Sequence, residues 1–139
     1  MGDGHHGWAA AEVCLAIRNA FVREVWTPGA DRPELVLLSG IPPAWMESNC
    51  RCTISGAPVP GGRLSIESAR HEDTLTVTIR ADPHEPGGSL QLSVRLPLTV
   101  ATVRMNGGAA RDVRVERDET WIDCGDCAGT VQVICECAG

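Results

Sequence analysis

The chain opens with Met1-Gly-Asp-Gly-His-His-Gly-Trp8 and runs directly into Ala9-Ala-Ala-Glu-Val-Cys-Leu-Ala-Ile-Arg-Asn-Ala-Phe-Val-Arg-Glu24. The glycines, the aspartate and the paired histidines of the first segment predict a tight polar loop, because glycine adopts backbone angles that other residues avoid. The second segment predicts a helix, since its consecutive alanines have the highest intrinsic helix propensity. After Pro28 the sequence has the pattern of strands, so the predicted plan is one helix followed by β-structure.

The predicted helix has an apolar stripe and a separate polar side, because residues three and four positions apart share one side of a helix. The stripe consists of Ala10, Val13, Cys14, Ile17, Ala20 and Phe21, and the polar side consists of Glu12, Asn19 and Arg23. An apolar stripe of this kind is normally buried against another element. We therefore expect the strands that follow to cover one stripe of the helix.

Apolar and polar residues alternate along the second half of the chain, as they do in strands with one buried face. The predicted inward positions are Leu64, Ile66, Leu75, Val77, Ile79, Leu90, Leu92, Val94, Leu96, Val113, Val115, Val131 and Val133. Turn signals separate these runs at intervals of roughly ten residues, which is typical of an antiparallel sandwich. The predicted fold is therefore mainly β: an antiparallel β-sandwich preceded by one N-terminal α-helix.

Shorter features complete this plan. The remaining predicted elements are strands over residues 34–38 and 50–54 and a loop over residues 57–62. Pro42-Pro43 predicts a rigid turn that places Trp45 on the core. Asn106-Gly107 predicts a hairpin turn between residues 103–105 and 112–115.

Several short segments together resemble the carboxy-terminal end of a large glycoside hydrolase. They are Gly2-Asp-Gly-His-His-Gly-Trp-Ala-Ala-Ala-Glu12, Ile17-Arg-Asn19, Val22-Arg-Glu24 and Leu37-Leu-Ser-Gly-Ile-Pro-Pro-Ala-Trp45. The enzymes that the chain resembles have an (α/α)6-barrel catalytic domain followed by a small β-sandwich, as in the α-L-rhamnosidase-like group. The resemblance implies that residues 1–27 are a Gly/His loop and the last barrel helix, and that residues 28–139 are the C-terminal β-sandwich domain.

The same resemblance implies an accessory, structural role in an enzyme of carbohydrate metabolism. In the parent enzyme His5 and His6, with Asp3, would contact the saccharide, because imidazole both donates and accepts hydrogen bonds. Glycoside hydrolysis needs two carboxylates about 5–9.5 Å apart across the scissile bond, and Asp3 is the only acid of the loop. We therefore expect a fragment that is not catalytic alone, uses no cofactor, and meets its saccharide through a parent barrel that carries the catalytic acids.

The resemblance also predicts how the isolated chain behaves. In the parent architecture the preceding barrel helices would cover a second side of the helix. Without them, the uncovered side is an exposed apolar patch, and such patches promote association. We expect a dimer or an aggregation-prone monomer that associates through the helix face.

The charge balance disfavours other partners. The net charge is −6, and the twelve basic residues are scattered, whereas binding to nucleic acid or to an anionic membrane needs clustered Lys and Arg. No apolar window approaches the roughly 18 residues of a membrane span, and no leader resembles a signal peptide. We expect a cytoplasmic protein. The acids at turns and strand ends are expected to be solvated; they are Asp82, Glu85, Asp118, Glu119, Asp123 and Asp126.

The seven cysteines leave three states open. Three close pairs, whose thiolates suit a tetrahedral zinc ion, are Cys50 with Cys52, Cys124 with Cys127, and Cys135 with Cys137. The alternation instead places these cysteines on inward strand positions, and Cys14 lies on the helix stripe; buried cysteine behaves as a small hydrophobic residue. Two positions apart on one strand is also poor disulfide geometry. We expect reduced core thiols, with zinc binding and disulfides as the alternatives.

A stand-alone carbohydrate- or zinc-binding module is the alternative function. Carbohydrate-binding sandwiches stack sugar rings on exposed aromatic side chains, and this chain has four tryptophans. We expect Trp8, Trp26 and Trp45 to pack at the joint between helix and sandwich. Trp121 is out of phase with its apolar neighbour Ile122, which directs it to the surface.

Overall fold

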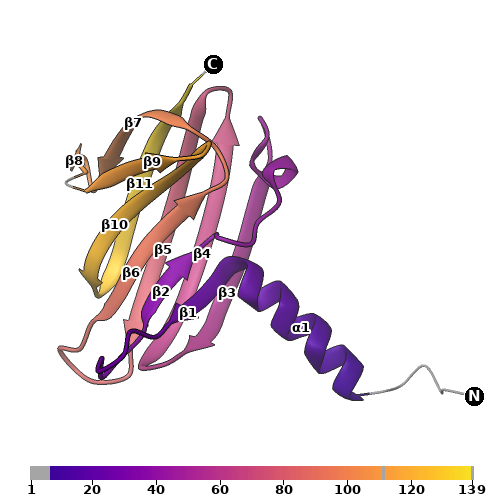
Figure 1. Cartoon of the computed structure of the whole chain (residues 1–139), viewed down its shortest axis with the longest axis vertical. Helices are drawn as coiled ribbons and strands as arrows, with labels where there is room; N and C mark the ends of the chain where they lie inside the picture. The colour runs from indigo at the N-terminus through magenta and orange to yellow at the C-terminus, as the bar shows by residue number, and fades with distance from the viewer. Residues whose placement is uncertain (1–6, 111, 139) are drawn as a thin grey trace, which may run out of the picture.

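Helix α1 (Gly7–Phe21) leads without a loop into the first strand of a two-sheet β-sandwich, as Figure 1 shows. The computed structural model describes residues 7–110 and 112–138. The helix extends away from the sheets, and its C-terminal end is the part that meets them (Figure 1). The predicted fold class, a mainly β structure with one N-terminal helix and two largely antiparallel sheets, is confirmed.

The strands form two sheets that pack face to face. Sheet A has the order β1-β2-β6-β10-β9 and consists of β1 (Val22–Val25), β2 (Glu34–Leu37), β6 (Leu90–Leu96), β10 (Glu119–Cys127) and β9 (Val113–Glu116). Sheet B has the order β3-β4-β5-β11-β7-β8 and consists of β3 (Arg51–Val59), β4 (Gly62–His71), β5 (Thr74–Pro83), β11 (Gly129–Cys137), β7 (Val100–Met105) and β8 (Gly108–Ala109). The paired strands described are antiparallel except β2 and β6, which are parallel.

The core between the sheets consists largely of the alternate residues that the sequence predicts. The predicted residues buried there are Leu64, Ile66, Leu75, Val77, Ile79, Leu90, Leu92, Val94, Leu96, Val131 and Val133. Leu35, Leu37, Ile122 and Cys135 are also buried. Each fully buried aliphatic side chain of this size stabilises the fold by roughly 1.5–3 kcal/mol. The strands therefore supply most of the core, and Phe21 of α1 and buried residues between β2 and β3 complete it.

The predicted helix is wrong at its C-terminal end. The helix was expected to continue to Glu24, but it ends at Phe21, and Val22–Val25 form β1, which pairs with β2. β-branched residues such as Val22 pack better on a pleated sheet than in a helix, and this pairing leaves Val22 fully buried. The sandwich thus begins inside the segment that was expected to hold only the loop and the helix.

The predicted strands over residues 34–38 and 50–54 are confirmed as β2 and β3. The predicted loop over residues 57–62 is much shorter, because β3 continues to Val59 and β4 starts at Gly62. The intervening turn uses Gly61 at a φ of +81°, a backbone angle that favours glycine.

The prediction that Trp45 lies on the core is wrong. The Pro42-Pro43 turn opens a short 3-10 helix, η1 (Pro43–Met46), between β2 and β3. Met46 is buried there, whereas Trp45 is 45% exposed. Successive residues of a 3-10 helix point about 120° apart, so the buried position falls one residue later than expected.

The predicted hairpin around Asn106-Gly107 is partly wrong. Both residues have positive φ, +51° and +81°, as a two-residue type I′ turn requires. The turn, however, pairs β7 with the short β8 rather than with residues 112–115. Residues 113–116 instead form β9 at an edge of sheet A.

The predicted burial of Val113 and Val115 is also wrong. The two valines pair with Ile122 and Thr120 of β10, so they share the core-facing side of sheet A. Both are nevertheless exposed, Val115 to 52%. Because β9 is an edge strand, alternation alone does not bring these side chains under cover.

Candidate functional site

Asp3, His5 and His6, the residues expected to contact a saccharide, lie outside the described residues. The helix that follows them, α1, is the first element that the structure places. Its surface and its attachment to the sandwich form the candidate site.

Helix α1 carries large apolar side chains that are open to solvent. Trp8 is 72% exposed, Val13 is 59% exposed, and Leu15 and Ile17 are each 52% exposed. Phe21, at the C-terminal end, is the buried residue of the helix. Apolar helix faces normally pack against another element, so this surface has the character of an interface.

The exposed apolar residues lie on two sides of α1. Val13 and Ile17 are four positions apart and share one side, whereas Leu15 is two positions from each and points about 200° away. Trp8 is seven positions from Leu15 and lies on the same side as Leu15. A partner that buries this helix must therefore reach both sides of it.

A groove lies on each side of α1, between the helix and the sandwich. The groove on the Leu15 side has a volume of about 620 Å³ and is lined by Leu15, Arg18, Asn19, Arg23, Glu24 and Pro58. The groove on the Ile17 side has a volume of about 460 Å³ and is lined by Ile17, Phe21, Ala44, Trp45, Cys50, Arg51, Cys52 and Thr53. Both grooves include exposed apolar residues of the helix, so each could receive a neighbouring element.

Arg18 attaches the last turn of α1 to both sheets. Its guanidinium donates to the carboxylate of Glu24 on β1 at 2.7 Å and to the carbonyl oxygen of Pro58 on β3 at 2.8 Å. Hydrogen bonds that involve charged groups are stronger than neutral ones, and a cation at a helix C-terminus is favoured by the helix dipole. Arg18 therefore holds the helix in one direction relative to the sandwich.

The loop after β2 closes against the same turn of α1. The Leu38 N–H donates to the Phe21 carbonyl oxygen at 2.7 Å, and the Gly40 N–H donates to the Ala20 carbonyl oxygen at 3.1 Å. These bonds satisfy carbonyl groups that the end of a helix leaves without helical partners. A Cβ atom on Gly40 would lie 2.8 Å from the Ala20 Cα, so the close approach requires glycine.

The prediction that the strands cover the apolar stripe of α1 is wrong for most of its length. Phe21 is buried and Ala20 is half-buried, but Val13, Cys14 and Ile17 are exposed. The reason is geometric, because the fixed junction with β1 directs the helix away from the sheets (Figure 1). Only the last turn is close enough to pack.

No protein-family model, curated protein or solved structure matches this chain. Among the described residues, no helix combines the length and apolar character needed to cross a lipid bilayer. The function of α1 must therefore be inferred from its residues and geometry.

The cysteines differ in burial, although all seven are free thiols. The buried thiols belong to Cys127, Cys135 and Cys137, and the half-buried ones belong to Cys50, Cys52 and Cys124. The prediction of core thiols is confirmed for the three buried residues. It is wrong for Cys14, which is exposed because the helix stripe is uncovered.

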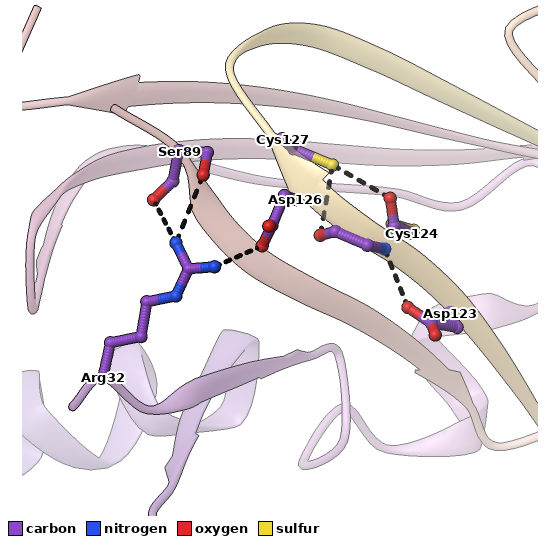
Figure 2. A network of polar contacts seen from close by, with 7 residues as sticks. Arg32, Ser89, Asp123, Cys124, Asp126 and Cys127 are labelled. Carbon is purple, nitrogen blue, oxygen red and sulfur yellow. Dashed lines mark hydrogen bonds and ion pairs between the residues drawn. The ribbon is translucent and has the colours of Figure 1, made fainter. Parts of the chain in front are cut away.

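A β-bulge at Cys124 shifts the alternation along β10, although Cys124 itself packs against the core as predicted. The pairing of β10 with β6 shifts between Asp123 and Gly125, which leaves Cys124 as the extra residue. The Gly125 N–H donates to the Asp123 carboxylate at 2.7 Å. Figure 2 shows the Cys127 thiol donating to the carbonyl oxygens of Cys124, at 3.2 Å, and of Gly125. Local hydrogen bonds with Asp123 and within the segment itself therefore hold Cys124-Gly-Asp-Cys127 in one conformation.

The thiols of the C-terminal strands are held in the protonated form. Burial raises the pKa of Cys124 to about 12, with a further contribution from Cys127 beside it, and burial raises the pKa of Cys135 to about 12. Zinc binds the thiolate, not the thiol. Within residues 7–110 and 112–138, no three His, Cys, Asp or Glu side chains are grouped so that they could hold a metal ion. In this part of the chain, the paired cysteines therefore do not form a zinc site.

The tryptophans expected at the joint are on the surface. Trp8, Trp26 and Trp45 are all exposed, so the prediction that they pack between helix and sandwich is wrong. Arg18, Phe21 and backbone contacts form that joint instead. Trp45 lies in the groove on the Ile17 side of α1.

Several acids that were expected to be solvated form ion pairs. These pairs are Asp82 with Arg80, Glu119 with Arg95, and Asp126 with Arg32. Figure 2 shows Arg32 donating to Asp126 at 2.7 Å and to both oxygens of Ser89. The contact ties the loop between β1 and β2 to strand β10. Exposed pairs such as Arg32–Asp126 contribute little stability, and the effect of this pair is to hold the loop beside β10.

Replacing Gly40 by alanine is expected to lower the free energy of unfolding by about 1–3 kcal/mol, because the added methyl group must push the last turn of α1 away from the sandwich. Gly108→Ala is the matched control, since the nearest atom to a Cβ at Gly108 is 3.8 Å away. Urea unfolding followed by circular dichroism measures both. Equal stability of the two variants would contradict a tight contact at Gly40.

The raised cysteine pKa values predict a loss of stability at alkaline pH. The usual thiol pKa is 9.0, and the folded values for Cys124 and Cys135 are about 12. As the pH rises, the unfolded chain therefore loses these protons before the folded chain does. The free energy of unfolding is unaffected below about pH 9 and falls as the pH rises from about 9 toward 12. Urea unfolding in reducing buffer at about pH 7.5 and pH 10 measures the loss.

Cys135→Ala should show a smaller alkaline loss of stability than the unmodified chain, because it removes one of the two thiols whose pKa burial raises to about 12. Cys14→Ala should show the full loss, since Cys14 is exposed. An identical pH dependence in both variants would contradict the assignment to buried thiols.

Proposed function

We propose that the chain is the C-terminal accessory region of a glycoside hydrolase of the α-L-rhamnosidase-like kind, in which α1 is the last helix of an (α/α)6 barrel. The observation that supports this proposal is the exposure of large apolar residues on two sides of α1. One side is marked by Val13 and Ile17 and the other by Leu15. A helix with this distribution suits a place between neighbouring elements rather than a solvated position.

The sandwich acts in this proposal as a rigid support for the helix. Arg18 bonds to both β1 and β3, and Gly40 fits against Ala20. The core of the sandwich takes only Phe21 from the end of α1, so the rest of the helix contributes little to its hydrophobic stabilisation. It can therefore present the helix to the barrel as a preformed element, which lowers the entropic cost of docking.

The free energy available from docking is substantial. Full burial of a side chain such as leucine, isoleucine or valine is worth roughly 1.5–3 kcal/mol, and at least half of each of Val13, Leu15 and Ile17 is still exposed. The barrel helices would fill the grooves on the two sides of α1. The role of the chain is then structural, and the catalytic carboxylates belong to the barrel.

The Gly/His loop enters this proposal through its position in the sequence. His5 and His6 directly precede α1, so a helix docked in the barrel brings them to the barrel with it. There they contribute hydrogen bonds to saccharide hydroxyl groups, with Asp3 beside them. The substrate of the whole enzyme is a saccharide.

The DNA upstream of the Met1 codon tests the assignment to a glycoside hydrolase. We expect an open reading frame that continues upstream without a stop codon and encodes repeated amphipathic helices together with a pair of acidic residues. An in-frame stop codon shortly before Met1, preceded by a ribosome-binding site, would contradict the proposal.

The chain without its barrel is expected to self-associate through α1, and Ile17→Glu should shift it toward the monomer, because a charge on the apolar side opposes burial. Val115→Glu is the matched control: Val115 is also 52% exposed but lies on β9, away from α1. Sedimentation velocity over a range of concentrations measures the effect. A monodisperse monomer before substitution, or dissociation by Val115→Glu alone, would contradict docking through the helix.

A further inference from the structure

The outward face of sheet A carries a polar pocket that shares no lining residue with the grooves beside α1. The pocket has a volume of about 260 Å³ and is lined by Glu34, Gln91, Ser93, Asp112, Arg114, Trp121, Ile122 and Asp123. These residues come from β2, β6, β10 and β9 or, in the case of Asp112, from the position just before β9. The volume lies below the roughly 300–1,000 Å³ of sites for drug-sized ligands, so it suits one small molecule.

The alternation of the strands explains why polar side chains gather on this face. Leu92 and Val94 of β6 and Ile122 of β10 are buried in the core. Their neighbours in the sequence, such as Ser93 and Trp121, therefore point to the outside of the sheet. Ser93 also pairs directly with Asp123 across the two strands.

Ser93 is the unusual residue of the pocket. It is 5% exposed, although it lies on the outward face. Its hydroxyl oxygen is buried and has no hydrogen-bond partner among the described residues. Buried polar groups nearly always have a partner. Because Ser93 lines the pocket, a turn of its side chain toward the pocket would let the hydroxyl form the missing hydrogen bond with a bound molecule.

The charges of the pocket select the kind of ligand. Glu34, Asp112 and Asp123 are acidic and Arg114 is basic, so the lining disfavours anions. The carboxylates accept hydrogen bonds, whereas Gln91, Ser93 and Arg114 can donate them. A ligand whose groups both donate and accept satisfies such a lining, and neighbouring hydroxyl groups have this property.

Trp121 supplies an apolar wall beside these polar groups. The guanidinium of Arg95 lies 4.7 Å from the centre of the indole ring, and Arg95 donates to the Glu119 carboxylate at 2.8 Å. These contacts fix the orientation of the ring before any ligand arrives. An indole surface next to hydrogen-bonding groups matches a sugar ring, which has apolar C–H groups on its faces and hydroxyl groups at its edge.

We propose that this pocket binds one neutral pyranose ring, with the indole of Trp121 against the ring and the hydroxyl of Ser93 hydrogen-bonded to a sugar hydroxyl. The site is independent of α1 and does not require the proposed docking to a barrel. It would make sheet A a saccharide-binding surface on the opposite side of the sheet from the core.

Isothermal titration with D-glucose, D-galactose, D-mannose, L-fucose and L-rhamnose tests the proposal. We expect at least one of these sugars to bind with a millimolar dissociation constant. Trp121→Ala should weaken that binding about tenfold or more through the loss of the aromatic wall, and Ser93→Ala should weaken it roughly fivefold through the loss of one hydrogen bond. Trp26→Ala is the control, since Trp26 is an exposed tryptophan outside the pocket. The affinity of this variant for the sugar should equal that of the unmodified chain.

The charge of the ligand provides a second test. Where the bound sugar has a uronic acid counterpart, the uronic acid should bind several-fold more weakly, because its carboxylate meets the acidic lining. Circular dichroism establishes that each variant is folded, and Ser93→Ala decides the outcome if Trp121→Ala does not fold. Absence of binding by every sugar, unchanged affinity in the folded pocket variants, or loss of binding in Trp26→Ala would overturn the proposal.

Discussion

Phe21 and Val22 are both buried where α1 becomes β1, and the path of the chain through this point fixes the direction of the helix. Arg18 bonds to both sheets beside the junction, and the backbone of the β2–η1 loop closes on the last turn. The remaining turns of α1 therefore extend beyond the reach of the strands (Figure 1). The exposed apolar residues and the two grooves follow from this single constraint.

The molecule thus combines a β-sandwich that buries its own core with a helix that the sandwich holds but does not cover. These two parts have different requirements. The sandwich obtains its stability from side chains that are buried between the sheets, such as Leu64 and Ile79 of sheet B and Val94 of sheet A. The helix obtains positioning from Arg18 and Gly40 but little burial before its last turn. A helix fixed in direction and left apolar on two sides is what the proposed docking into a helical barrel requires.

Much of the sandwich could be predicted from the sequence, because period-2 alternation depends on neighbouring residues alone. The burial of Val113 and Val115 could not be predicted in this way. Alternation indicates which face of an edge strand a residue lies on, but not whether another element covers that face. The bulge at Cys124 interrupts the alternation in the middle of β10. The exposure of α1 depends on the angle of its junction with β1, for which the sequence carries no local signal. The pocket on sheet A could not be predicted without the strand order, because its residues are scattered from Glu34 to Asp123 in the sequence. Surface positions were expected for residues such as Trp121 and Asp123, but not that they would line one pocket.

Native-state hydrogen exchange tests most directly whether α1 is held only at its C-terminal end. At a dilution where the chain is monomeric, we expect the amides of residues 10–17 to exchange about a hundredfold or more faster than those of the central strands β5 and β11, because a helix without tertiary cover opens locally. Protection of residues 10–17 equal to that of β5 and β11 in the dilute monomer would instead show that the helix is enclosed within its own chain.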